Sequence, residues 1–138
     1  MNPSRDAKDA AGQGKISKGV EKRYGFSKFE RIKKNSEFTK ARRLGGYYKE
    51  GAFTLTILKN NLERHRLGMS IGSSKLPLAP ERNRLKRLIR EVFRINKSKL
   101  KNGFYDIIIA IRRALPRKAD YSTVEGKLLV LLKKAKAL

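Results

Sequence analysis

With 138 residues the chain is long enough for one domain with a modest core, and its 35 Lys and Arg against 12 Asp and Glu give a formal net charge of +23. This excess repels itself in a compact state and so indicates a polyanionic partner, a nucleic acid before an anionic membrane surface. The absence of cysteine excludes disulfides and thiolate metal sites, and the lack of both a long apolar run and a secretory signal predicts a cytoplasmic protein with no membrane partner.

The start of the chain differs in composition from the rest. Residues 1–23 carry few large apolar side chains, which predicts a flexible basic tail ahead of a single domain over residues 24–138. A basic arm that becomes ordered on RNA is the alternative for this tail. The first helix is expected to begin at a cap formed by Asn35 or Ser36 and to end at the glycine pair 45–46.

Three stretches have the apolar patterns of strands. Residues 52–58 alternate large apolar side chains with threonines, as a half-buried strand does. Residues 66–72 repeat the alternation after a turn at 60–64. Residues 104–111 form a nearly continuous, β-branched apolar run, which is typical of a central strand buried on both faces.

Two further helices complete the predicted elements. Pro80 suits the opening of a helix over residues 81–100, and the Leu-rich C-terminal segment follows a capping box, Ser122-x-x-Glu125. The order helix, strands, basic helix, strand, helix predicts an α+β sandwich of a sheet with helices. The general rule favours a right-handed crossover in the strand–helix–strand unit.

The helix predicted over residues 81–100 separates apolar from cationic side chains. At about 100° per residue, each set falls within an arc of about 140°. The apolar arc contains Leu85, Leu88, Ile89, Val92 and Phe93, and the cationic arc contains Arg82, Lys86, Arg87, Arg90, Arg94 and Lys97, with Arg84 at the border of the apolar face. A solvated face normally mixes signs, whereas this one carries like charges at i,i+4 spacing, which repel one another. We interpret it as a polyanion site that suits RNA shape better than base sequence.

No pattern of residues indicates catalysis by the polypeptide. There is no P-loop, no GxGxxG and no pair of carboxylates at a suggestive spacing, so we predict neither catalytic residues nor metal ligands. His65, the single histidine, follows a turn, and a solvent-exposed or turn role is expected for it. Most aromatic side chains should lie in the core, although stacking on a base is the alternative for some of them.

The segment RNRLKRLIRE at 82–91 closely resembles the RNR signature of the bacterial ribonuclease P protein subunit. RIKKNSEFTKA at 31–41, FTLTIL at 53–58, RLGMSIGSSK at 66–75 and YDIIIAIRR at 105–113 follow in the family's order, so the resemblance extends over residues 26–136. It implies an α-β-β-β-α-β-α sandwich resembling the second domain of a small-subunit ribosomal protein. It also implies a left-handed βαβ crossover around the RNR helix, against the general rule.

The function that the resemblance implies is that of a subunit. Such a protein joins a catalytic RNA that removes the 5′ leader of precursor tRNA, so the chain would belong to an endoribonuclease without catalysing the hydrolysis itself. Magnesium ions held by the RNA would carry out the reaction, and no cofactor is expected on the protein. The residues that would bind the catalytic RNA are Arg82, Asn83, Arg84, Lys86, Arg87 and Arg90.

The resemblance also implies a cleft for the leader between the first helix and the sheet. It would be lined by Phe38, Arg42, Thr54 and Thr56, and the alternation of residues 52–58 independently places the two threonines opposite the core side chains. Arg42 stands where a second cleft aromatic is usual, and Thr56 where a tyrosine can occur. We therefore expect leader contacts that depend more on charge than on stacking. The loop over residues 72–81 also departs from the family pattern.

Two alternatives belong to other functional classes. A basic structural RNA-binding protein of the ribosomal type would share the composition without a role in processing. A helix-turn-helix DNA binder would need a helix packed just before residues 81–100. The strand-like segment 66–72 and a proline-rich loop occupy that place, which disfavours it.

Overall fold

The computed structural model describes residues 28–115 and 120–138, so the predicted tail over residues 1–23 lies outside the described part of the chain. The described elements are η2 (Lys28–Glu30), α2 (Asn35–Leu44), β1 (Gly46–Glu50), β2 (Phe53–Lys59), β3 (Arg66–Ser70), α3 (Ala79–Asn96), η3 (Lys97–Lys99), β4 (Tyr105–Ile111) and α4 (Tyr121–Lys134). Apart from the short 3-10 turns, this order is the α-β-β-β-α-β-α order implied by the resemblance.

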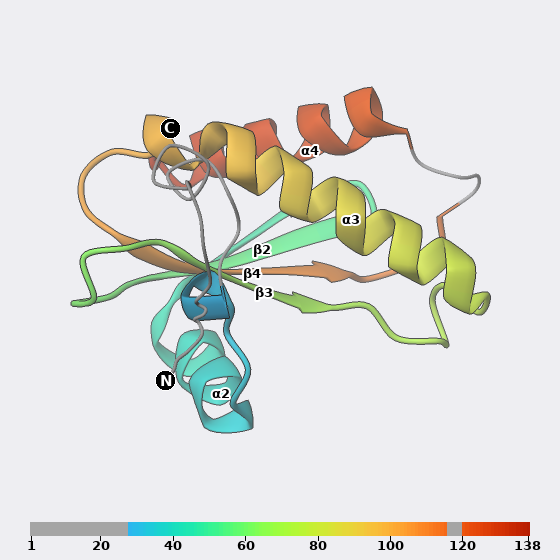
Figure 1. Ribbon diagram of the computed structural model, residues 1–138, viewed down its shortest axis with the longest axis horizontal. Coiled ribbons are helices and arrows are strands. Elements are labelled where there is room, and N and C mark those ends of the chain that lie inside the picture. The colour runs from blue at the N-terminus through green and yellow to red at the C-terminus, as the bar shows by residue number, and fades with distance from the viewer. Residues whose placement is uncertain (1–27, 116–119) are drawn as a thin grey trace, which may run out of the picture.

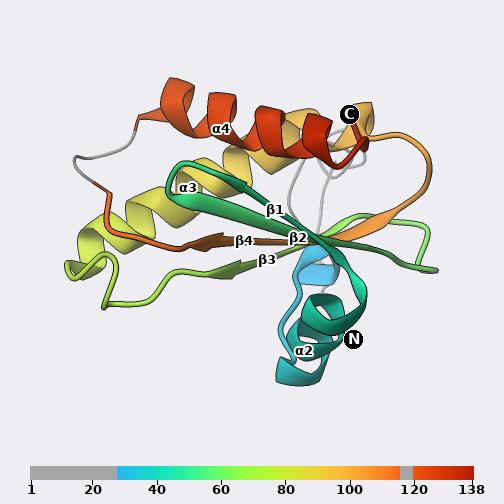
Figure 2. The same ribbon diagram turned by 180° about the vertical axis from the view of Figure 1, so that it is seen from behind.

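The four strands form one sheet in the order β1-β2-β4-β3. β2 pairs antiparallel with β1 and with β4, whereas β3 pairs parallel with β4. Helices α3 and α4 cover one face of the sheet and α2 lies against the other (Figure 1), and the view from behind has the same layers (Figure 2). The α+β sandwich is therefore confirmed.

The β3–α3–β4 unit gives the sheet its parallel pair. In Figure 1 both strands point to the right, β3 lies nearer the viewer than β4, and α3 passes above them. This arrangement makes the crossover left-handed, as the resemblance implied, and the general preference for a right-handed crossover does not hold here.

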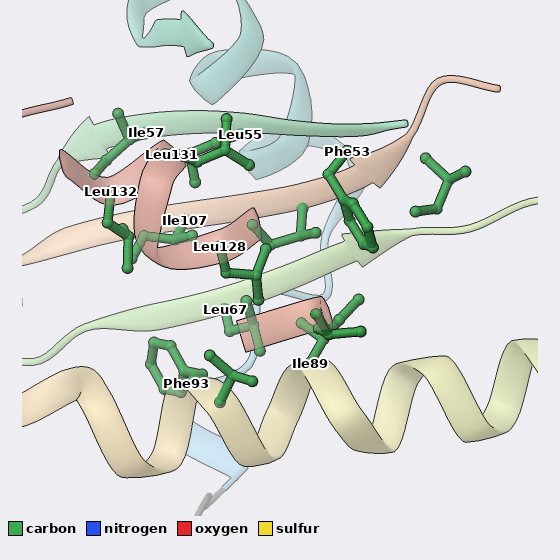
Figure 3. Close-up of a cluster of buried hydrophobic side chains, with 14 of the residues drawn as sticks. Phe53, Leu55, Ile57, Leu67, Ile89, Phe93, Ile107, Leu128, Leu131 and Leu132 are labelled. Atoms are coloured by element: carbon green, nitrogen blue, oxygen red, sulfur yellow. The ribbon is translucent and has the colours of Figure 1, made fainter. Parts of the chain in front are cut away.

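The main core lies between the sheet and the helices α3 and α4 (Figure 3). β2 contributes every second side chain to it, because successive side chains of a strand point to opposite faces. β4 is apolar on both faces: Ile107 and Ile109 join the main core, whereas Ile108 packs with Ile32 and Ala41 beneath α2. The prediction of a central strand buried on both faces is confirmed.

Both predicted helix caps are wrong. The N-cap of α2 is Lys34, which makes no side-chain cap, and its carbonyl oxygen accepts from the backbone N–H groups of Glu37 and Phe38. Asn35 and Ser36 already lie inside the helix. The N-cap of α4 is Asp120, whose carboxylate accepts from the N–H of Thr123 at 2.8 Å, because an Asp in extended backbone satisfies an orphan N–H at this place.

The residue pattern alone does not predict β1, because it indicates only the end of the first helix at the glycine pair, whereas the element order implied by the resemblance includes this strand. Gly45 does end α2, and its N–H donates to the carbonyl oxygen of Ala41. A Cβ at Gly45 would lie 2.5 Å from the carbonyl oxygen of Ile57 and 2.7 Å from that of Ala41. The chain therefore needs glycine here to turn closely across β2 and enter β1.

Candidate nucleic-acid interface

A cleft opens between α2 and the face of the sheet that α2 only partly covers. It consists of two adjoining hollows that share Arg42 and Ser70. The hollow nearer β3 is lined by Ile32, Lys33, Asn35, Phe38, Thr39, Arg42, Met69 and Ser70. The hollow nearer β1 is lined by Arg42, Tyr47, Thr54, Thr56, Ser70, Ile108, Ala110 and Arg112. The structure thus brings all four predicted cleft residues, Phe38, Arg42, Thr54 and Thr56, around one cleft.

The floor of the cleft consists of small side chains. Thr54 and Thr56 alternate with the core residues of β2 and so point toward α2, as the sequence pattern predicted. Both are buried, with exposed fractions of 3% and 6%. The hydroxyl of Thr54 lies 3.4 Å from the carbonyl oxygen of Ala110, to which it donates. A low floor of this kind leaves space for a flat group above the sheet.

Phe38 lies at the β3 side of the cleft, and Gly68 makes room for it. A Cβ at Gly68 would come within 2.8 Å of the Phe38 ring and 3.2 Å of Ile32. One turn further along α2, the guanidinium carbon of Arg42 lies 5.8 Å from the centroid of the same ring, which is cation–π range. Phe38 and Arg42 therefore combine an aromatic face with a positive charge.

The lining of the cleft is positive. Lys33, Arg42 and Arg112 border it, and neither hollow has an acidic residue among its described lining residues. Phosphate groups would meet cations here without meeting a carboxylate, and Arg42 and Arg112 each present a fork of donors that suits phosphate oxygens.

Arg66 on β3 holds the carboxylates of Asp106 and Glu37. Its guanidinium contacts Asp106 at 2.7 and 2.9 Å and Glu37 at 2.9 Å, and Asn60 donates to the same Asp106 carboxylate at 2.8 Å. Burial acts to raise the pKa of Asp106, but the hydrogen bonds from Arg66 and Asn60 outweigh it and hold the pKa below its usual value. This network ties α2 to β3 and β4 and compensates negative charge next to the cleft.

Tyr47 is a cleft residue that sequence reasoning missed. It lines the hollow nearer β1 and pairs with Thr56 across the β1–β2 ladder. In the structure the side chains of β1 alternate in exposure, but the strand is only five residues long and begins at a glycine, so its sequence has no pattern long enough to predict the direction of Tyr47. Ser70 and Arg112 were missed for a related reason, since each reaches the cleft from a strand end.

The basic helix α3 presents a second surface. Leu85, Ile89, Val92 and Phe93 are buried against the sheet and α4, which confirms the predicted apolar face. Asn83 and Arg87 are exposed, whereas Arg82, Arg84, Lys86 and Arg90 are half-buried. The predicted RNA-contact residues thus share one helix but lie in different surroundings.

Three of these arginines have neighbours that constrain them. Arg82 donates from one Nη to the carbonyl oxygens of Leu76 and Pro77, both at 2.8 Å, so it braces the loop before α3. Arg84 lies near the start of α4: the pKa of Asp120 there is lowered mainly by its hydrogen bond with Thr123, and the charge of Arg84 adds to this. Burial lowers the pKa of Arg90, and the charges of Arg31 and Arg87 add to this.

One of the acidic residues of α3, Glu91, is paired within the helix. Arg94 contacts Glu91 at 2.5 and 3.1 Å, so each offsets the charge of the other. The hydrogen bond from Arg94 lowers the pKa of Glu91. Toward the start of α3, Asn83 and Arg87 therefore stay exposed beside a surface that is net positive.

The expected exposure of His65 is wrong. Its side chain is buried, and its Nδ1 accepts from the backbone N–H of Tyr105 at 3.1 Å. Its ring stacks on Tyr105 and contacts Phe104, with centroids 5.7 and 5.1 Å away. The position just before β3 places it beside the start of β4, where that backbone N–H needs an acceptor.

The described residues contain neither a cluster of metal ligands nor a helix that could span a membrane. Within residues 28–115 and 120–138, no three His, Cys, Asp or Glu side chains gather closely enough to hold a metal ion. None of the helices in those ranges is long and apolar enough to cross a lipid bilayer.

Comparison with known proteins decides the family. The sequence model described as "Ribonuclease P" matches residues 26–136, which include the cleft and the basic helix. The chain belongs to the ribonuclease P protein family. The ribonuclease P protein component of Clostridium botulinum (strain Loch Maree) is 40% identical over 108 residues, which span 78% of this chain and 96% of that protein. That of Thermotoga maritima is 36% identical over 112 residues, 79% of this chain and 94% of that protein.

Solved structures of the ribonuclease P protein family share the fold. The RNase P protein of Staphylococcus aureus superposes with a TM-score of 0.69 at 32% identity, covering 78% of this chain and 96% of that one. The Thermotoga maritima RNase P protein gives a TM-score of 0.63 at 32% identity, with 76% and 96% covered. These likenesses establish family and fold, and the roles of the individual cleft and α3 residues stay predictions.

Proposed function

We propose that this chain is the protein subunit of a cytoplasmic ribonuclease P, an endoribonuclease that matures the 5′ end of tRNA. In this proposal α3 binds the catalytic RNA and the cleft binds the 5′ leader of precursor tRNA. The observation that carries it is the cleft itself, where aromatic and cationic side chains meet over a small polar floor with no carboxylate in its described lining.

The chemistry of the cleft suits a single strand of RNA. A base can stack on Phe38 while the guanidinium groups of Arg42 and Arg112 reach phosphates on either side. Stacking on an aromatic face tolerates any base, because every base has a π-face. The cleft would therefore hold leaders of differing sequence, as a general processing enzyme requires.

The surface on α3 suits a folded RNA. Arg87 and Asn83 project from the helix, with Lys86 and Arg90 beside them. Phosphates and 2′-hydroxyls are what an A-form helix offers to a protein, and arginine and asparagine side chains match both. Helices α3 and α2 lie on opposite faces of the sheet (Figure 1), and the cleft is lined by residues of α2. The protein would therefore bridge the catalytic RNA and the leader.

The proposal gives the protein a positioning role. The carboxylates of Glu37 and Asp106 are engaged by Arg66, and Asp106 is buried. We assign hydrolysis to the RNA subunit and to magnesium ions held by that RNA, whose phosphates the protein's positive charge helps to neutralise.

Reconstitution tests this function. Adding the full chain to its cognate ribonuclease P RNA should lower the magnesium concentration needed for leader removal, because the protein supplies cations and a leader contact. Cleavage of a precursor tRNA is measured across a magnesium titration with and without protein. Unchanged cleavage at every magnesium concentration would exclude the subunit role, and copurification with ribosomes would then favour a structural RNA-binding protein.

A further inference from the structure

Tyr47 is exposed where a strand of RNA would leave the cleft. Its side chain is 56% exposed although it borders the hollow nearer β1. Within the described part of the chain, its hydroxyl has no hydrogen-bond partner. Single exposed aromatic residues are common on protein surfaces, so exposure alone assigns no role. Its neighbours are what distinguish it.

One cation lies near the Tyr47 ring, and two more line the same hollow. Lys49, two residues further along β1 and on the same face, has its ammonium nitrogen 5.9 Å from the ring centroid. Arg42 from α2 and Arg112 after β4 border the same hollow. A base stacked on Tyr47 would therefore have donors for its phosphates in several directions.

The residue opposite Tyr47 on β2 has no aromatic ring. Thr56 is its partner across the β1–β2 ladder, and the small Thr56 side chain is buried in the cleft floor. In this chain the aromatic surface at this end of the cleft thus comes from the edge strand β1. Paired strands bring opposite side chains close together, so a ring on β1 can cover the space above its partner on β2.

The cleft then has two aromatic faces at opposite sides. Phe38 lies over Gly68 on β3, and Tyr47 lies on β1. With the order β1-β2-β4-β3, three strand spacings separate them, which is about 14 Å at 4.7–4.9 Å per spacing. Arg42 borders both hollows and so lies between the two faces.

We propose that Tyr47 is a second base-stacking residue of the cleft, so that the leader crosses the sheet from Phe38 on β3 to Tyr47 on β1. This inference rests on the proposed function and adds a subsite to it. The bound leader segment must then be long enough to reach both rings, and nucleotides beyond that reach add little affinity. Stacking at Tyr47 tolerates any base and adds affinity without base preference.

The test uses the reconstituted holoenzyme and a series of precursor tRNAs whose leaders lengthen by one nucleotide. Tyr47→Ala should weaken binding about 10-fold, the scale of one stacked base, for leaders long enough to reach β1. It should leave the shortest leaders unaffected. Tyr47→Phe keeps the ring and should bind every leader as the wild type does. Phe29→Ala, which removes another exposed aromatic side chain outside the cleft lining, is the matched control.

A fluorescent base reports the contact itself. 2-Aminopurine, placed at successive leader positions, should be quenched at one position in the wild type and in Tyr47→Phe but not in Tyr47→Ala. Equal weakening of all leaders by Tyr47→Ala, or no weakening of any, would overturn the subsite. Failure of the proposed function looks different, because the wild-type holoenzyme would then gain no affinity from any leader.

Discussion

At the residue scale, His65 makes the fold sensitive to mildly acidic pH. Its Nδ1 accepts a backbone hydrogen bond, and burial lowers its pKa, with the charge of Lys97 adding to the effect and that of Glu30 opposing it. The unfolded chain, with a histidine pKa near 6.5, therefore takes up the proton first. The stability that this depressed pKa represents is present above pH ~6.5 and is lost as the pH falls toward the folded-state pKa.

We expect the free energy of unfolding to fall by about 1 kcal/mol between pH 7.5 and 5.5, roughly the value of one buried hydrogen bond. Urea denaturation at the two pH values measures this. Paired carboxylates such as Asp106 and Glu91 have lowered pKa values, so their protonation changes the free energy of unfolding only at more acidic pH. His65→Gln removes the titrating group and should abolish the difference, whereas an equal pH dependence in this variant would contradict the assignment.

The sequence predicted the direction of side chains that follow the two-residue alternation of a strand. Thr54 and Thr56 alternate with core residues, so their place opposite the core could be read from period 2 alone. The helix caps could not: α2 begins at Lys34, which has no capping side chain to detect, and at α4 both Asp120 and Ser122 offered an oxygen suited to a cap. Tyr47 was missed because the strand that directs it depends on pairing with β2, a contact between separate segments.

At the element scale, α3 was the most predictable part of the chain. Its apolar side chains recur at helical spacing, and the observed helix begins two residues earlier and ends four residues earlier than predicted. Two contacts mark the end at Asn96: its side chain donates to the carbonyl oxygen of Val92 one turn earlier in the same helix, and Lys97 pairs with the distant Glu30 at 2.5 Å. The pairing with Glu30 has no local sequence signal.

The exposed face of α3 gives a prediction about RNA assembly. Arg87→Ala should weaken binding to the catalytic RNA about 10-fold at low salt and reduce the slope of log K against log salt by about 1, because one phosphate contact is lost. Binding is measured over a range of salt concentrations. Arg87 suits this test better than Arg82, whose removal would also release the carbonyl oxygens of Leu76 and Pro77.

Lys133 supplies the control for that measurement. It is exposed on α4, and Lys133→Ala makes the same charge change away from the basic face of α3. Its salt slope should stay close to that of the wild type. If both variants lowered the slope equally, net charge alone would drive assembly and the face of α3 would have no special part.

At the scale of the whole molecule, the left-handed β3–α3–β4 crossover determines where the basic helix lies. Residue patterns predicted the elements and the α+β class, but they contain no signal for handedness, and the general rule gives the opposite hand. Only the resemblance to a family gave the observed hand. The crossover keeps α3 on the face opposite α2, so that the cleft beside α2 stays open.

This separation predicts that the two surfaces act independently. Arg87→Ala should weaken assembly with the RNA, and Phe38→Leu, which keeps an apolar side chain over Gly68, should weaken only the binding of leader-bearing substrate by the assembled enzyme. Because sites on opposite faces share no partner, the effects on the free energy of forming the full complex should add within about 0.5 kcal/mol. Assembly and substrate binding are measured separately for each variant.

The double variant Arg87→Ala/Arg90→Ala is the matched comparison for the pair Arg87→Ala and Phe38→Leu. These side chains lie one turn apart on α3, and the charge of Arg87 helps to lower the pKa of Arg90, so their effects should depart from additivity. A coupling between Arg87 and Phe38 as large as this neighbouring pair would mean that the RNA-binding face and the cleft communicate through the sheet. The sheet would then transmit RNA binding to the leader site, and the view of the protein as a rigid bridge would be wrong.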